Sequence, residues 1–190
     1  MRVLGIDPGS RFMGYGVVED QRGKLVHVGH GLIRVDAEAA LEWRLKELHE
    51  ALLDALKRYR PDAVAVEGVF TFRNARSALV LGHARGVALL AAAQVGLTVY
   101  EYAPTKVKRS VGAGGSADKD AVARMVRTFL ELEELERADV SDALAVALCH
   151  LNHGRAAVPA GGRSVKARSK TARSRLADKL TPSYRRPEAG

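Results

Sequence analysis

Val3-Leu4-Gly5-Ile6-Asp7-Pro8-Gly9-Ser10 sets the pattern for this 190-residue chain. Its first residues form the short apolar run that is typical of a buried β-strand, and Pro8-Gly9 then forces a turn. Asp7 is therefore expected at the C-terminal end of a strand. Residues 63–67 repeat the pattern, because small and β-branched residues stop at Glu67. If the two strands are neighbours, the two carboxylates converge at one edge of a sheet.

Two further acids stand close together near residue 140. Asp139 and Asp142 are three residues apart where an apolar helical pattern begins. This spacing places both side chains on one face of the helix. They also lie at its N-terminal end, where the helix dipole favours negative charge.

The four acids are best explained together. Two unit charges about 4 Å apart repel by roughly 4 kcal/mol at an effective dielectric constant near 20, so a shared pocket requires either protonation or bound cations. An all-oxygen ligand set is typical of Mg²⁺ or Mn²⁺ rather than zinc, and pairs of such ions cleave phosphodiesters. Each acid alone could instead stabilise a turn, cap a helix or be merely exposed. The set of four favours a site for divalent cations.

The rest of the pattern predicts an α/β fold. Strand-like runs at residues 2–7, 14–19 and 24–34, separated by polar turns, are typical of an antiparallel meander. The elements expected after them are a leucine-faced helix over about 41–56, the strand ending at Glu67, a helix over about 76–95, a strand over 97–102, a flexible glycine loop at 112–115, a helix from Ser116 to about Leu130 and a last helix from near Asp139. This order predicts a ribonuclease H-like mixed five-stranded sheet flanked by helices.

The net charge of +8 is unevenly distributed. Residues 155–190 carry ten Lys or Arg and two acids, which leaves 20 basic and 20 acidic residues of the 30 and 22 in the chain for residues 1–154. The C-terminal segment has few large apolar residues and many Gly, Ser and Pro, so we predict a disordered basic tail after a single nuclease domain at 1–154. The tail could add salt-sensitive affinity for phosphate backbones, or only keep the protein soluble.

Cysteine content and hydropathy predict the compartment. The single cysteine, Cys149, cannot form an internal disulfide, which favours a reducing environment. No apolar run is expected to span a membrane, and the N-terminus lacks the features of a secretory signal. We expect a cytoplasmic protein. His150 and His153 accompany Cys149 on one helix, but with no fourth ligand in view a zinc site is not expected.

Small residues recur at fourfold spacing in the second predicted helix. Ala78, Gly82 and Gly86, together with Ala93, would allow a neighbouring backbone to approach closely. This face could pack in a dimer interface or against the protein's own sheet, and the sequence leaves both open.

Several motifs together resemble the RuvC family of bacterial Holliday-junction resolvases. In chain order they are Gly5-Ile6-Asp7-Pro8-Gly9-Ser10, Gly14-Tyr15-Gly16, Glu67-Gly68-Val69-Phe70, Leu81-Gly82-His83-Ala84-Arg85-Gly86 and Ala138-Asp139-Val140-Ser141-Asp142-Ala143-Leu144-Ala145. They span about residues 1–154. The resemblance implies a homodimer that binds a four-way DNA junction, makes two symmetric nicks with Mg²⁺ or Mn²⁺, and works with the RuvA and RuvB branch-migration proteins in recombination and repair.

The resemblance also implies roles for individual residues. Asp7, Glu67, Asp139 and Asp142 match the family's acidic tetrad and are expected to be catalytic. We expect them to hold two ions and to direct water at a phosphodiester, leaving 5′-phosphate and 3′-hydroxyl ends.

The expected DNA contacts lie around these acids. Phe70 matches an aromatic residue that stacks on bases near the crossover. Lys108 and Lys119 match basic residues near the scissile phosphate, where Lys119 would stabilise developing charge. Without the resemblance, both lysines would be interpreted as solvated surface residues. Three residues beyond Phe70 could contact the DNA backbone (Arg73, Asn74 and Arg76).

Other functions are compatible with parts of the pattern. Residues 5–9 also resemble the first phosphate loop of the actin and sugar-kinase superfamily, but that fold needs two related halves and this chain supplies one. A non-catalytic DNA-binding module would not need four acids facing a polyanion. A ribonuclease H-like nuclease for another branched or hybrid substrate is not separated from a resolvase by the acids alone.

Overall fold

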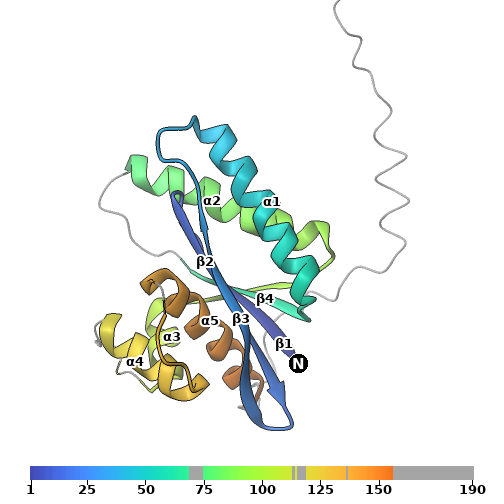
Figure 1. The fold of residues 1–190 in the computed structure, drawn as a ribbon, viewed down its shortest axis with the longest axis vertical. Coiled ribbons are helices and arrows are strands. Elements are labelled where there is room, and N and C mark those ends of the chain that lie inside the picture. The colour runs from blue at the N-terminus through green and yellow to red at the C-terminus, as the bar shows by residue number, and fades with distance from the viewer. Residues whose placement is uncertain (69–74, 113, 115–118, 136, 156–190) are drawn as a thin grey trace, which may run out of the picture. The chain divides into compact units, whose positions relative to one another are not determined.

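The structure is a computed structural model that describes residues 1–68, 75–112, 114, 119–135 and 137–155 (Figure 1). The described residues form one five-stranded sheet in the order β3-β2-β1-β4-β5, flanked by helices. The strands are β1 (Arg2–Asp7), β2 (Phe12–Gln21), β3 (Lys24–Arg34), β4 (Ala63–Glu67) and β5 (Val99–Tyr102). The predicted mixed sheet is confirmed, with β1–β2–β3 antiparallel and β1–β4–β5 parallel.

The antiparallel half depends on a tight hairpin. Between β2 and β3, Arg22 and Gly23 have φ values of 54° and 99°. Consecutive positive φ angles are the geometry of hairpin turns whose twist matches that of the strands. The backbone N–H of Gly23 also donates to Asp20 Oδ1 at 2.8 Å, which closes the turn.

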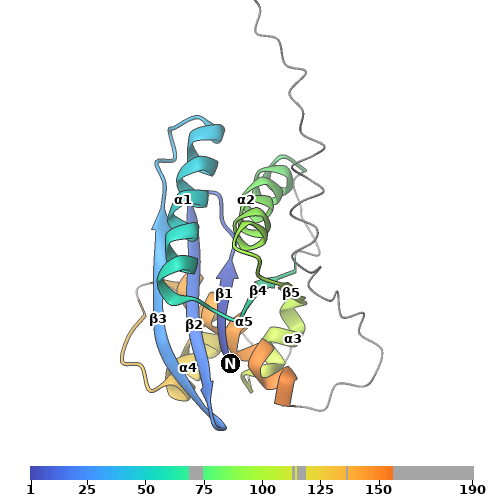
Figure 2. The ribbon, with the colours of Figure 1, turned by 90° about the vertical axis from the view of Figure 1, so that its right-hand side faces the viewer.

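Two layers of helices enclose the sheet (Figures 1 and 2). On one face lie α1 (Leu41–Tyr59) and α2 (Ala75–Gln94), and on the other α3 (Pro104–Ser110), α4 (Lys119–Leu130) and α5 (Ala138–Arg155). α3 was not predicted, although Pro104 at its first turn is a common helix start. Residues 115–118, where α4 was expected to begin, lie outside the described residues, as does the predicted tail from residue 156 onward.

Successive residues of β1 and β4 point to opposite faces of the sheet. Leu4, Ile6 and Val66 join the core under α1 and α2, whereas Val3 and Ala65 join the core under α5. Counting in twos along each strand from Val3 and Ala65 leads to Asp7 and Glu67. Both strand-end acids therefore lie on the α5 face.

Glycines on that face let the backbone of α5 lie directly on the sheet. A Cβ atom on Gly14 would collide with the carbonyl oxygen of Asp139, and one on Gly5 with that of Ala143. On Gly16 it would come within 2.5 Å of the Leu144 side chain. The three glycines thus fix which residues of α5 lie over β1 and β2.

Candidate active site

Asp7 and Glu67 end neighbouring parallel strands. β1 and β4 pair up to Ile6 and Val66, the residues immediately before the two acids. Neighbouring strands lie about 4.8 Å apart, so the two acids start from adjacent positions at one edge of the sheet. Both side chains are half-buried. The two strands are neighbours, which is the condition that the sequence set for the two acids to converge.

α5 brings the other two acids to the same place. Asp7 lies opposite Gly14 in the β1–β2 ladder, and the backbone of Asp139 rests on Gly14. Asp142 follows one turn later, beside Ala143, which rests on Gly5. Three elements separated in sequence by about 130 residues therefore direct four carboxylates to one end of the sheet.

A basic side chain that the sequence did not single out already contacts this group. Arg137 Nε donates to Asp139 Oδ2 at 3.0 Å, and the guanidinium carbon lies 4.1 Å from the centre of the Phe12 ring. The Arg137 side chain is 43% exposed and that of Asp139 is 28% exposed. Arg137 thus acts as a built-in counterion for one of the four acids. The position of Arg137 in the sequence, two residues before Asp139 at the start of a helix, was the signal that could have pointed to this ion pair.

The four acids fit a hard divalent cation in donor chemistry and in backbone placement. All contribute carboxylate oxygens, the ligands that Mg²⁺ and Mn²⁺ prefer. Over the described part of the chain, however, no three His, Cys, Asp or Glu side chains form a group in ligand geometry. The Arg137–Asp139 ion pair is one physical reason, because it holds the Asp139 carboxylate toward Arg137. Binding an ion would require the acidic side chains to move from the positions that they have here.

Comparison with known proteins identifies the family. Residues 3–150 match the family model described as crossover junction endodeoxyribonuclease RuvC. The chain belongs to the RuvC family.

Full-length relatives agree with this assignment. A crossover junction endodeoxyribonuclease RuvC of Myxococcus xanthus is 74% identical over 191 residues, covering 100% of both chains. The RuvC of Geobacter sulfurreducens is 51% identical over 152 residues, which cover 80% of this chain and 93% of that one. Among solved structures, Thermus thermophilus RuvC in complex with a Holliday junction substrate matches with a TM-score of 0.75 at 35% identity, covering 83% of this chain and 97% of that one. The predicted ribonuclease H-like fold is confirmed by this match.

Three of the six predicted DNA contacts lie within the described residues. Arg76 is exposed in the first turn of α2, and Lys108 is half-buried in the last turn of α3. Lys119 is the first residue of α4. α2 and α3 follow β4 and β5, and the carboxyl ends of these parallel strands form the edge that carries Asp7 and Glu67. Phe70, Arg73 and Asn74 lie outside the described residues, so their roles stay predictions.

A buried polar cluster braces the strand next to Glu67. Tyr102 pairs with Glu67 in the β4–β5 ladder, and its hydroxyl shares a hydrogen bond of 2.7 Å with His150 Nδ1 on α5. Burial raises the pKa of Tyr102 to about 12 and lowers the pKa of His150. His153 Nδ1 lies 2.9 Å from the Cys149 carbonyl oxygen. These contacts give His150 and His153 a structural role in place of a metal-binding one, and they link the end of β5 to α5.

Proposed function

We propose that this chain is a crossover junction endodeoxyribonuclease that resolves Holliday junctions by paired symmetric nicks during recombination and DNA repair. The observation that carries the proposal is the convergence of Asp7, Glu67, Asp139 and Asp142 from β1, β4 and α5 at one edge of the sheet. Membership of the RuvC family supports it, as does the likeness to a relative solved with its Holliday junction substrate.

The proposal includes dependence on Mg²⁺, which Mn²⁺ could replace, with two ions for each active site. Asp7 has the central strand position, between β2 and β4, and would be a ligand common to both ions. Glu67 on one side and the acids of α5 on the other would complete the set. Ions held there would lower the pKa of the attacking water and stabilise charge on the leaving oxygen.

The remaining steps belong to the protein's own groups. Asp7 and the acids of α5 orient water for in-line attack on the phosphodiester, and the break leaves a 5′-phosphate and a 3′-hydroxyl end. Lys119, at the start of α4, stabilises the charge that develops on the phosphate. Phe70 stacks on a base near the crossover, while Arg73, Asn74, Arg76 and Lys108 bind neighbouring backbone.

Two symmetric nicks require two active sites, and the outer side of α2 is a suitable surface for a homodimer. Leu79 and Leu90 are 62% and 52% exposed. A Cβ atom on Gly82 or Gly86 would meet no atom of the described residues within 4 Å, so packing against the sheet does not explain these glycines. Four buried alanines do that packing instead (Ala84, Ala88, Ala91 and Ala92). A twofold axis beside α2 would place the same apolar stripe on both partners.

The many apolar residues of α2 also raise its hydropathy. Among the described helices, α2 alone is long and apolar enough to cross a membrane, with a mean hydropathy of 1.2 over its most apolar window, of which 22% is buried. The sequence-based expectation that no run reaches this length is therefore wrong for α2. Its many Ala, Val and Leu residues raise the hydropathy although Arg76 and Arg85 lie within the helix. A dimer would cover this apolar surface. We propose that the protein is cytoplasmic and that RuvA and RuvB are its partners.

Cleavage of synthetic DNA tests the function. Four-way, three-way and linear duplexes of equal length are incubated with Mg²⁺ and with the wild type, Glu67→Gln or Glu50→Gln. Glu50 is a matched control because it is an exposed acid of α1, paired with Lys46 at 3.0 Å. We expect the wild type and Glu50→Gln to nick only the four-way junction at paired sites, and Glu67→Gln to be inactive. Equal cutting of the linear duplex would refute junction selectivity, and an active Glu67→Gln would refute the acidic site.

A further inference from the structure

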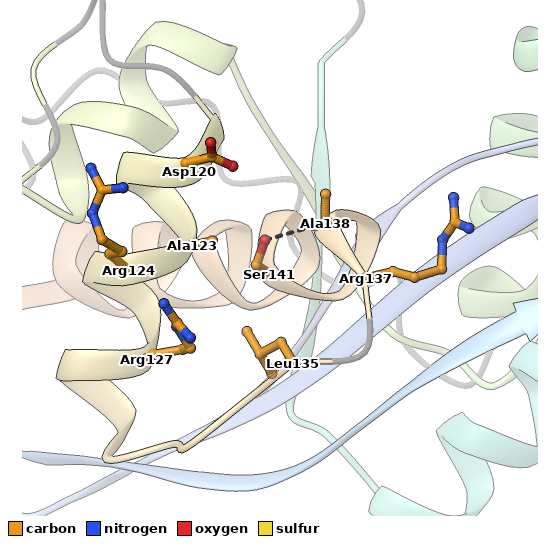
Figure 3. Close-up of a pocket in the computed structure, with 8 residues that line it drawn as sticks. All are labelled: Asp120, Ala123, Arg124, Arg127, Leu135, Arg137, Ala138 and Ser141. Atoms are coloured by element: carbon orange, nitrogen blue, oxygen red, sulfur yellow. Dashed lines mark hydrogen bonds between the residues drawn. The ribbon is translucent and has the colours of Figure 1, made fainter.

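A positively charged groove lies between α4 and the beginning of α5. Its volume is about 420 Å³. Arg124 and Arg127 project from α4, and Ala138 and Ser141 lie opposite them on α5 (Figure 3). Its charged lining residues are Arg124, Arg127, Asp120 and Arg137, but the Arg137 side chain points away from the other two arginines and is paired with Asp139 (Figure 3). The excess of positive charge favours an anionic occupant.

The two arginines of α4 differ in how they are held. Within the described part of the chain, the Arg124 guanidinium makes no hydrogen bond or ion pair, and the residue is exposed. Arg127 is half-buried, and its Nη1 donates to the Glu133 carbonyl oxygen at 3.4 Å, which orients the guanidinium from the loop before α5. A guanidinium has five N–H donors, so most of those of Arg127 are left for a ligand.

The groove is next to the acidic site on α5. Ala138 and Ser141 line the groove, and Asp139 and Asp142 each follow one residue later, which is about 100° further around the helix. The groove and the acids thus occupy neighbouring sides of the same two turns. Along α4, Arg127 lies eight residues beyond Lys119, or about 12 Å at 1.5 Å per residue. A strand held at Lys119 and the acids can therefore continue along α4.

The donors in the groove suit a phosphodiester. Guanidinium groups bind phosphate oxygens through two parallel hydrogen bonds, and the N-terminal end of an 18-residue helix favours negative charge. The Ser141 hydroxyl is not counted among the donors to the phosphate, because it already donates to the Ala138 carbonyl oxygen at 2.8 Å. Asp120 opposes an anion and would limit the affinity.

We propose that Arg124 and Arg127 bind one backbone phosphate of the DNA arm that leaves the active site, away from the scissile phosphate. This inference rests on the proposed function. It adds a contact on α4 that is separate from Phe70, the residues after it, Lys108 and Lys119. Because such a contact reads no base, it positions the arm without selecting a sequence.

The test is the salt dependence of DNA binding, measured by fluorescence anisotropy in EDTA so that no strand is cut. The proteins are the wild type, Arg124→Gln, the double variant Arg124→Gln/Arg127→Gln, Asp120→Asn and Arg22→Gln. Arg22 is a matched control, because it is exposed in the β2–β3 turn, at the opposite end of the sheet from Asp7. Each is titrated with the four-way junction and with a linear duplex at several salt concentrations.

Loss of one phosphate contact lowers the slope of log K against log salt by about 0.9. We expect this in the double variant, with junction binding about three- to tenfold weaker at moderate salt, and a smaller change in the same direction for Arg124→Gln. Asp120→Asn should bind more tightly, and Arg22→Gln should match the wild type. Arg124 is exposed, and its guanidinium has no hydrogen bond or ion pair with the described residues, so we expect Arg124→Gln to keep the unfolding midpoint of the wild type, which is measured alongside.

Two outcomes would overturn the inference or its basis, and they are distinguishable. If the double variant has the slope and affinity of Arg22→Gln on both DNAs, the groove binds no phosphate, while the proposed function stands. If the wild type binds the four-way junction no better than the linear duplex, the proposed function fails. The slope on the linear duplex then still decides whether the groove binds phosphate.

Discussion

The two faces of the sheet are covered by helices in different ways. Under α1 and α2, branched side chains such as Leu4 and Ile6 keep the helices at the distance of an ordinary apolar core. Under α5, Gly5 and Gly14 remove the side chains, so the helix backbone rests on the strands. Close approach on one face brings the acids of α5 to those of the strands, whereas the other face supports a helix, α2, whose outer side is left apolar. The proposed catalytic site and the proposed dimer surface thus belong to opposite faces of the sheet.

Removal of a strand-end acid on the α5 face should have the largest effect. Asp7→Asn keeps the shape of the side chain but removes the charge at the centre of the site. We expect junction cleavage to fall on the order of 10³-fold or more, because a central ligand is lost. The measurement is the single-turnover nicking rate with Mg²⁺, with anisotropy as the control that junction binding persists. A wild-type rate would show that Asp7 is not part of the catalytic group.

A methyl group between α5 and β1 should have the next largest effect. In Gly5→Ala the added carbon would collide with backbone atoms of Ala143 and Ala147, which cannot move as a flexible side chain does. We expect the free energy of unfolding in urea to fall by about 1 to 3 kcal/mol or more, with displacement of the acids of α5 and loss of cleavage. Gly96 is not suitable as a control because it has a positive φ, so the control is Gly114→Ala, where an added Cβ atom would meet no atom of the described residues within 4 Å. Equal stability of the two variants would show that α5 does not rest on β1 as described.

A charge on the outer side of α2 should act on association alone. Leu79→Glu and Leu90→Glu replace exposed residues, so the fold of each monomer should be retained. Loss of a central apolar contact at an interface costs about 2 kcal/mol, which weakens dimerisation roughly 30-fold. Sedimentation velocity at micromolar concentration measures the change. A wild type that sediments only as a monomer under these conditions would contradict the dimer.

Acidification should distinguish the polar core under α5 from the apolar core under α1 and α2. Burial lowers the pKa of His150 from its ordinary value of 6.5, so the fold favours the neutral ring, which is hydrogen-bonded to Tyr102. Unfolding then takes up a proton below pH 6.5, and the stabilisation present above that pH is lost as the pH falls. We expect the urea midpoint of the wild type to fall as the pH is lowered below 6.5. His150→Gln should show a shallower dependence; an identical slope would exclude His150 as the cause.

The strand ends and the spacing of the acids could be predicted from the sequence, because each depends on a local pattern of residues. Asp7 and Glu67 follow apolar runs, and Asp139 and Asp142 share a helical face. The side of the sheet on which they lie was not legible, since the alternation within β1 and β4 does not say which helix covers which face. Arg137 stacking on Phe12 joins residues 125 positions apart, and no local pattern announces such a contact.

Other differences have a similar cause. α3 has only seven residues, Pro104–Ser110, which is too short to show a helical period in the sequence, so the helix was missed. The predicted strand at 97–102 is shorter, because only Val99–Tyr102 pair with β4. The hydrogen bond between Tyr102 and His150 depends on how β5 and α5 meet, which the sequence pattern does not specify.

Anomalous diffraction from crystals soaked in Mn²⁺ would locate bound ions in relation to the four carboxylates. We expect anomalous peaks between the ends of β1 and β4 and the first two turns of α5, with oxygens of Asp7, Glu67 and Asp142 at about 2.0 to 2.2 Å, the distance typical of small hard cations. Crystals of Asp7→Asn grown and soaked in the same way should show no peak there. Peaks elsewhere on the protein, or equal peaks in Asp7→Asn, would contradict a metal site built by the close approach of α5 to the sheet.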